Sequence, residues 1–349
     1  GLDLRQGPGV QRQFHARCAG GGGGRQVVLG GAQPTGDHRR VASPADPAQE
    51  FRDLGQVVSH AGVPGHVEPG LFERFSDVAY RTDGDGPLLP LTVFAPTAPG
   101  PWPTAVMIHG GGGAYGAIVL EPWAEAVAAE GAVVFVPRWA NGGLQPDAAE
   151  AIAAFADSAA QLACTVRFAR SEAGRYGGDP ADLSLFGHSG GGHWASIIAL
   201  TDPAASPDCL AKADSAIPDD LVLFEGDWLL HGHPTWDVLL AQDHAVWAAQ
   251  TPWPHLVDGP RLPVTILDSD DRTLAIEPRA RIDESMALRD PDGSLREKLE
   301  RSGALADGRL TETEAQQLLA DELAALGYPV SFVDLPDSNH EFLSGAALT

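Results

Sequence analysis

The stretch 183–195 constrains the fold most strongly, because it predicts a buried strand, a sharp corner and a helix in direct succession. The corner, residues 187–191, reads Gly-His-Ser-Gly-Gly and fits the pattern Gly-x-Ser-x-Gly. A direct turn from strand to helix strains the backbone of the central residue and holds its side chain up at the edge of the sheet. Glycine is needed at Gly187 and Gly191 because bulkier residues would collide with neighbouring backbone. The stretch therefore predicts a nucleophile at Ser189.

The pattern itself is loose, since this chain contains 41 glycines and a glycine-rich loop is the competing interpretation. The apolar residues before the corner and the helical run 193–200 after it favour the nucleophile. The N–H groups and the positive dipole end of that helix would face a developing oxyanion at the same place.

A second run of glycines follows another apolar strand, 104–108, and reads His-Gly-Gly-Gly-Gly over 109–113. Consecutive glycines let backbone N–H groups converge on an oxyanion without obstruction by side chains. We expect the amides of Gly111, Gly112 and Gly190 to form this oxyanion hole. A phosphate-binding loop is the alternative, but no Lys-Ser/Thr follows and no Gly-x-Gly-x-x-Gly spacing is present.

Apolar strands alternate with helical stretches from residue 104 onward, which indicates an α/β fold with a mostly parallel sheet covered by helices on both faces. In such sheets the reactive groups gather in the loops beyond the carboxyl ends of the strands. The predicted strands are 72–80, 88–94, 104–108, 132–137, 183–186, 221–224, 263–267 and 330–335, and the predicted helices include 121–130 and 147–176.

A serine hydroxyl becomes a strong nucleophile only when a base takes its proton and an acid orients the base. His340, in the loop after the last strand, is the preferred base, and a surface loop histidine is the alternative. For the acid, Asp271 is preferred because it lies a few residues beyond its strand, with Asp268 second and Asp270 third. Of the other histidines, two lie too close to the serine (His188, His193) and four precede the first strand. Four more lie in the irregular stretch 226–260 and are rivals only if it folds over the site (His231, His233, His244, His255).

The formal net charge of −24 disfavours nucleic acids and anionic membranes as partners. No apolar run approaches the roughly 18 residues that a membrane span needs, so we expect a soluble protein. The sequence leaves the compartment open, with the cytoplasm ahead of export. Cys18, Cys164 and Cys209 fit neither a disulfide framework nor the spacing of metal ligands, and Cys164 is expected to be a small core residue.

We expect a flexible leader over 1–45 and one catalytic domain over 46–349, with a possible small cap at 226–260. An acidic helical insertion occupies 277–326. Its segment 307–314 resembles the second half of a calcium-binding EF-hand loop, but the residues before it do not supply the first ligands. We expect a surface helical hairpin there, and neither a metal nor a cofactor.

The two glycine motifs, 109–112 and 187–191, together resemble those of the α/β-hydrolase superfamily, in particular serine esterases of the acetylxylan/feruloyl esterase-like and arylformamidase-like types. The resemblance covers about residues 70 to 345. It implies a catalytic triad of Ser189, Asp271 and His340, and ester hydrolysis through an acyl-enzyme. The run Asp-Arg-Thr-Leu at 271–274 looks like the acid loop of the family, although Asp268 stands where a glycine is usual.

The sequence therefore predicts a serine carboxylesterase that acts on small or aryl carboxylic esters as small-molecule substrates. Two alternatives remain, an arylformamidase-type amidase with the same triad and a catalytically silent binding protein with this fold. Tyr115, Trp139 and Trp194 are the candidate substrate-binding residues, because aromatic side chains near the strand ends often line such pockets. The oligomeric state stays open.

Overall fold

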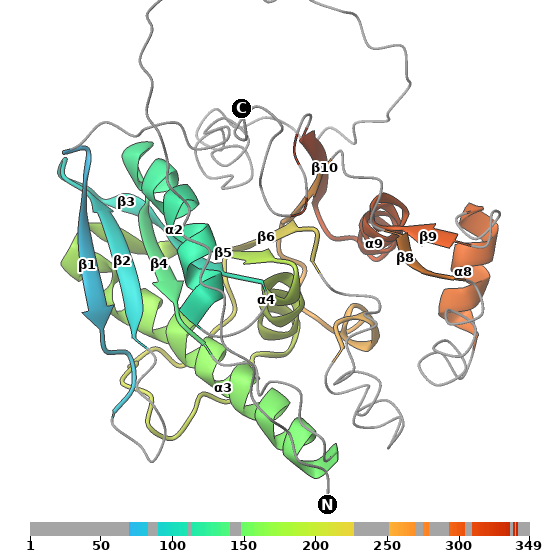
Figure 1. The fold of residues 1–349 in the computed structure, drawn as a ribbon, viewed down its shortest axis with the longest axis horizontal. Helices are drawn as coiled ribbons and strands as arrows, with labels where there is room; N and C mark the ends of the chain where they lie inside the picture. Colours follow the sequence, from blue (N-terminus) through green and yellow to red (C-terminus); the bar gives the residue numbers. More distant parts are fainter. Residues whose placement is uncertain are drawn as a thin grey trace, which may run out of the picture. The chain divides into compact units, whose positions relative to one another are not determined.

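The computed structural model describes residues 70–82, 90–110, 114–139, 148–226, 251–269, 275–278, 293–303, 309–335, 338 and 340, and Figure 1 shows the arrangement of the elements. The predicted leader and most of the predicted cap lie outside these residues. Within the described part, no helix combines the length and the apolar character that crossing a membrane requires.

The described residues form an eight-stranded sheet in the order β1-β2-β4-β3-β5-β6-β7-β10. Strand β2 runs antiparallel to both of its neighbours, and all pairs from β4 to β10 are parallel, so the predicted mostly parallel sheet is confirmed. The strands are β1 (Phe72–Val78), β2 (Leu91–Pro96), β3 (Trp102–Ile108), β4 (Val133–Pro137), β5 (Gly178–His188), β6 (Asp220–Phe224), β7 (Val264–Ser269) and β10 (Val330–Leu335).

Alternating side chains of the sheet pack into two separate hydrophobic clusters, one on each face. In β4, Val133 and Phe135 belong to the larger cluster, and Val134 and Val136 belong to the smaller one. Helix α2 packs in the smaller cluster, whereas α3 and α4 pack in the larger one, so helices cover both faces as predicted. These helices are α2 (Ala114–Ala129), α3 (Ala148–Glu172) and α4 (Gly190–Thr201), and the short 3₁₀ helices are η1 (Ala173–Tyr176) and η2 (Trp253–His255).

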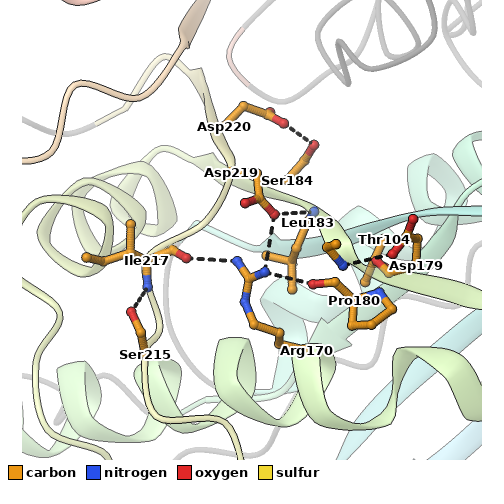
Figure 2. Close-up of polar contacts among 11 residues, drawn as sticks. Thr104, Arg170, Asp179, Pro180, Leu183, Ser184, Ser215, Ile217, Asp219 and Asp220 are labelled. Atoms are coloured by element: carbon orange, nitrogen blue, oxygen red, sulfur yellow. Dashed lines mark hydrogen bonds and ion pairs between the residues drawn. The ribbon is translucent and has the colours of Figure 1, made fainter. Parts of the chain in front are cut away.

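A half-buried arginine fixes the starts of β5 and β6 relative to each other (Figure 2). Arg170, in the last turn of α3, donates to the carbonyl oxygens of Pro180 at 2.7 Å and Ile217 at 2.9 Å, and to the Asp219 carboxylate at 3.3 Å. The same carboxylate accepts from the backbone N–H of Leu183 at 2.8 Å. One guanidinium therefore aligns the amino ends of these two parallel strands. Their carboxyl ends also lie side by side.

The acidic insertion is more than a surface hairpin. It contains α8 (Ser294–Ser302), a small antiparallel pair of β8 (Ala275–Pro278) with β9 (Arg309–Thr311), and α9 (Glu312–Ala325). A capping box between Thr311 and Glu314 starts α9, because each side chain accepts from the backbone N–H of the other. One face of α9, including Leu319 and Leu323, is buried in the larger core cluster, so the expected surface location is wrong for this helix.

A disulfide joins Cys164 in α3 to Cys209 in the segment after α4, with the two Cα atoms 5.6 Å apart. The sequence prediction that the cysteines are unpaired is therefore wrong for these two, although Cys164 is fully buried as expected. Their pairing follows from the packing of α3 against a segment 45 residues away, which no local spacing reveals. An ion pair of 2.8 Å between Arg81 and Asp208 holds the same segment.

Replacing Cys209 with alanine is expected to lower the free energy of unfolding by about 2–4 kcal/mol, because the disulfide closes a long loop in the unfolded chain. Denaturant titration of the wild type with and without reductant, and of the variant, measures this difference. The matched control is Cys18→Ala, which should leave stability unchanged. A wild type that is equally stable with and without reductant would contradict the pairing.

Candidate functional site

Ser189 lies between the end of β5 and the first residue of α4. Its backbone has φ 52° and ψ −124°, a positive-φ conformation that non-glycine residues rarely adopt and that the corner motif predicts. The Ser189 N–H donates to the carbonyl of Phe224 in the neighbouring strand β6 at 3.0 Å, which fixes the corner to the sheet. The strain thus holds the hydroxyl at the carboxyl edge of the sheet, beside the N-terminus of α4.

The glycines around this corner are sterically required. A Cβ on Gly187 would lie 2.5 Å from the carbonyl oxygen of Gly191, and a Cβ on Gly191 would lie 2.2 Å from the carbonyl oxygen of Ile108. A Cβ on Gly110 would lie 2.7 Å from the Cβ of Ser189, so the second glycine run begins directly beside the corner. The predicted collisions are therefore confirmed. Two of the expected oxyanion donors, Gly111 and Gly112, lie outside the described residues, and the third, Gly190, is the first residue of α4.

His340 faces the serine and an acidic side chain at the same time. Its Nε2 lies 3.0 Å from Oγ of Ser189, and its Nδ1 lies 2.7 Å from Oε2 of Glu225. With Oε2 of Glu225 as the acceptor, Nδ1 of His340 carries the ring proton and donates the hydrogen bond. Nε2 is then the acceptor that faces the hydroxyl of Ser189, which is the arrangement that a nucleophile and its base require.

Glu225 is the first residue after β6 and is almost fully buried, with 2% of its surface exposed. Its φ of 44° is also left-handed, so this turn is strained like the serine corner. The Glu225 N–H donates to the carbonyl of Leu267 at 3.2 Å, and Oε1 accepts from the N–H of Ser269 at 2.9 Å. Both carboxylate oxygens therefore have partners, which fixes the direction in which Oε2 meets His340.

The carboxylate that contacts His340 is not the one that the sequence favoured. Asp271 and Asp270 lie outside the described residues, and Asp268 is a buried residue of β7. The position on Nδ1 is occupied by Glu225, which sequence reasoning did not consider. A signal was available, because Glu225 directly follows the apolar strand 221–224 and so stands at the same sheet edge as Ser189 and His340.

His188 supports the loop that carries His340. Its Nε2 lies 2.6 Å from the carbonyl oxygen of His340, and its ring stacks on that of Phe224 with centroids 5.4 Å apart. Burial lowers the pKa of His188 to about 3, and the nearby His340 adds to this shift, so the ring is neutral near pH 7. Because a carbonyl only accepts, the single ring proton lies on Nε2, which donates a hydrogen bond to the carbonyl oxygen of His340. The sequence pattern excluded His188 as the base and did not predict this contact.

The two tryptophans among the candidate substrate-binding residues belong to the buried core. Trp139 and Trp194 are 1% and 3% exposed, with ring centroids 6.3 Å apart in an edge-to-face contact. Trp139 also stacks on His109 at 5.5 Å, and burial lowers the pKa of His109 to about 4. Trp139 thus packs against His109, the residue at which the second glycine run begins. Tyr115 belongs to α2, but its side chain lies outside what the structure describes.

The chain matches no protein-family model and no curated protein sequence. It is similar to solved structures of esterase 2 from Thermogutta terrifontis. The apo form has 20% sequence identity and a TM-score of 0.53, and the alignment covers 82% of this chain and 91% of that one. The form phosphonylated by sarin has 18% identity, the same coverages and a TM-score of 0.53. The butyrate-bound form has 20% identity and a TM-score of 0.51, with coverages of 80% and 89%.

A likeness at such low identity establishes the fold, and the chain therefore has the α/β-hydrolase fold that the glycine motifs predicted. The fold brings its strand ends to one edge, and there His340 lies within hydrogen-bonding distance of both Ser189 and Glu225. Such an arrangement can transfer an acyl group to the serine and then to water.

The contact of His188 with the His340 carbonyl gives a test of this arrangement. His188→Phe keeps an aromatic ring but removes the donor, and a lost buried hydrogen bond of about 1.4 kcal/mol corresponds to a tenfold effect. We therefore expect a fluorophosphonate probe to label Ser189 about tenfold more slowly. His188→Gln keeps a side-chain N–H and should recover part of the rate. Unchanged labelling of a folded His188→Phe protein would show that the contact does not hold His340.

Proposed function

We propose that this protein is a serine carboxylesterase that hydrolyses small or aryl carboxylic esters through an acyl-enzyme intermediate. One observation carries the proposal: the unbroken chain of hydrogen bonds from Ser189 Oγ to His340 Nε2 at 3.0 Å and from His340 Nδ1 to Glu225 Oε2 at 2.7 Å. The strained backbone at Ser189 supports it independently, because strain of this kind concentrates at functional sites.

In the first half of the reaction, Oγ of Ser189 attacks the carbonyl carbon of the ester while Nε2 of His340 takes the hydroxyl proton. Glu225 stabilises the resulting imidazolium through the proton on Nδ1. As the tetrahedral intermediate collapses, the imidazolium gives its proton to the leaving alcohol, and the acyl group remains on the serine. In the second half, His340 deprotonates a water molecule, which attacks the acyl carbon. As the bond from that carbon to Oγ breaks, His340 returns the proton to Oγ of Ser189 and the carboxylic acid is released.

The negative oxygen of the tetrahedral intermediate needs donors that are already in place. We assign this role to the amide of Gly190 at the start of α4 and to the amides of Gly111 and Gly112. The position of Gly110 against Ser189 supports this assignment, because the next residues of the glycine run follow directly from it. Removing one such donor typically lowers turnover by about 10²–10³.

The similar structures support a small acyl group. Those of Thermogutta terrifontis esterase 2 include a propionate-bound and a butyrate-bound form, and forms that carry phosphonyl or phosphoramidyl groups from organophosphorus compounds. We therefore extend to this chain the hypothesis of short carboxylic esters as substrates. The arylformamidase-type amidase and the silent binding protein are the competing functions that experiments must separate.

Hydrolysis of p-nitrophenyl esters of increasing acyl length, of feruloyl and acetylated-sugar esters and of formylkynurenine tests this proposal. We expect the highest kcat/KM for short acyl or aryl esters, and stoichiometric labelling of the wild type by a fluorophosphonate. Ser189→Ala should lose both hydrolysis and labelling, because the nucleophile is gone. Preferred turnover of formylkynurenine would favour the amidase, and a wild type that neither labels nor hydrolyses would leave the silent binding protein.

The identity of the acid gives a separate prediction. Glu225→Gln keeps the shape of the side chain but no longer stabilises the imidazolium or the correct tautomer, so we expect kcat to fall by about 10³–10⁴. Asp268→Asn and Asp271→Asn are the matched controls and should lower kcat by about tenfold at most. Steady-state kinetics on one p-nitrophenyl ester compares all three. A larger loss in Asp271→Asn than in Glu225→Gln would return the role to Asp271.

A further inference from the structure

Two polar side chains near the start of α9 are buried, and the proposed mechanism does not use them. Glu312 is 5% exposed and Gln316 is completely buried, although both belong to a helix whose other buried residues are apolar or small. Polar groups are rarely buried unless they form hydrogen bonds, so their partners indicate what they do.

Those partners connect α9 to the acid of the site. Nε2 of Gln316 donates to Oε1 of Glu312 at 2.7 Å and to the carbonyl oxygen of Gly226 at 3.1 Å. Gly226 directly follows Glu225 in the chain. Both N–H groups of the Gln316 amide are thereby used, one on its own helix and one on the turn that carries the acid.

That turn needs external support, because Glu225 has a left-handed φ of 44°. On its other side, the turn lies against the first turn of α4. A Cβ on Gly192 would lie 2.5 Å from the Cα of Gly226, so the two backbones are in close contact. The acid-bearing turn is therefore held between α4, which begins at the nucleophile, and the amide of Gln316 on α9.

Charge couples the same residues. The charges that act on Glu312 are those of Glu225 at the end of β6, Asp268 in β7 and His340, and Gln316 on its own helix donates to it. Burial raises the pKa of Glu312 to about 7, while Gln316 and His340 oppose this shift and the carboxylates of Glu225 and Asp268 add to it. Glu312 thus changes its charge near neutral pH, and its negative form favours a positive His340.

We propose that Gln316 and Glu312 are positioning residues for the site, with Gln316 fixing the turn of Glu225 and the charge of Glu312 stabilising the imidazolium of His340. This inference rests on the proposed function, because it assigns both residues to the same reaction. It also gives α9 a role that the sequence of the acidic insertion does not suggest.

Glu312→Gln tests the charge, because the amide keeps an oxygen that accepts from Gln316 but carries no charge. The imidazolium loses a nearby counter-charge, so the acid limb of the pH profile of kcat/KM should move to lower pH by about half a unit or more. Turnover above pH 8 should fall about two- to fivefold with KM nearly unchanged. Asp321→Asn is the matched control, because Asp321 forms an exposed pair with Gln317 on the same helix, 2.9 Å apart, and its loss should leave the profile in place.

Gln316→Leu tests the support of the turn, because leucine keeps most of the volume and removes both hydrogen bonds. We expect kcat to fall about tenfold with KM nearly unchanged, and labelling of Ser189 by a fluorophosphonate to slow in parallel. Wild-type kcat in a folded Gln316→Leu protein would overturn the positioning role. A Glu312→Gln profile that overlays that of the wild type would overturn the charge coupling.

A stability measurement separates this inference from the proposed function. In the unfolded chain Glu312 ionises at its usual pKa, whereas in the folded protein Glu312 keeps its proton until about pH 7. Folding therefore loses stability as the pH rises from about 4.5 to 7, and Glu312→Gln should gain stability relative to the wild type between pH 5 and 8. If Glu312→Gln gains stability and the wild type shows no labelling, the esterase is rejected and the buried charge is retained. No gain would reject the buried charge itself.

Discussion

The site depends on one hydrogen bond, the 2.7 Å contact between Nδ1 of His340 and the carboxylate of Glu225. It selects the tautomer of His340, and only in that tautomer can Nε2 accept the proton of Ser189 at 3.0 Å. The bond joins two segments 115 positions apart in the chain, so no local structure maintains it. Parallel strands maintain it instead, because they bring the ends of β5, β6 and β10 to one edge of the sheet.

Strain and burial accompany this bond at both ends of the site. Ser189 and Glu225 each have a positive φ, and the backbone N–H of each corner donates to a carbonyl of the neighbouring strand. The strain costs free energy that the packed sheet and the helices on both faces offset. His188 completes the arrangement by holding the carbonyl of His340, so the residue next to Ser189 also fixes the loop of His340.

Much of this follows from sequence patterns whose causes are local. The corner at 187–191 predicted the strained serine and the collisions that exclude larger residues at Gly187 and Gly191, because both effects arise within a few residues. The alternation of strands and helices predicted the sheet, and the position of His340 after the last strand predicted its meeting with Ser189. What the patterns missed arises from contacts between distant segments. Glu225 had the same strand-end position as the other site residues, but the likeness of 271–274 to the acid loop of the family favoured Asp271. The partner of Cys164 depends on the packing of α3.

Proton NMR of the resting protein tests the central bond most directly, because a proton held between an imidazole Nδ1 and a buried carboxylate resonates far downfield of other signals. The account predicts one such signal that disappears in His340→Ala and in Glu225→Gln and persists in Asp271→Asn. A downfield signal that persists in Glu225→Gln but disappears in Asp271→Asn would contradict it.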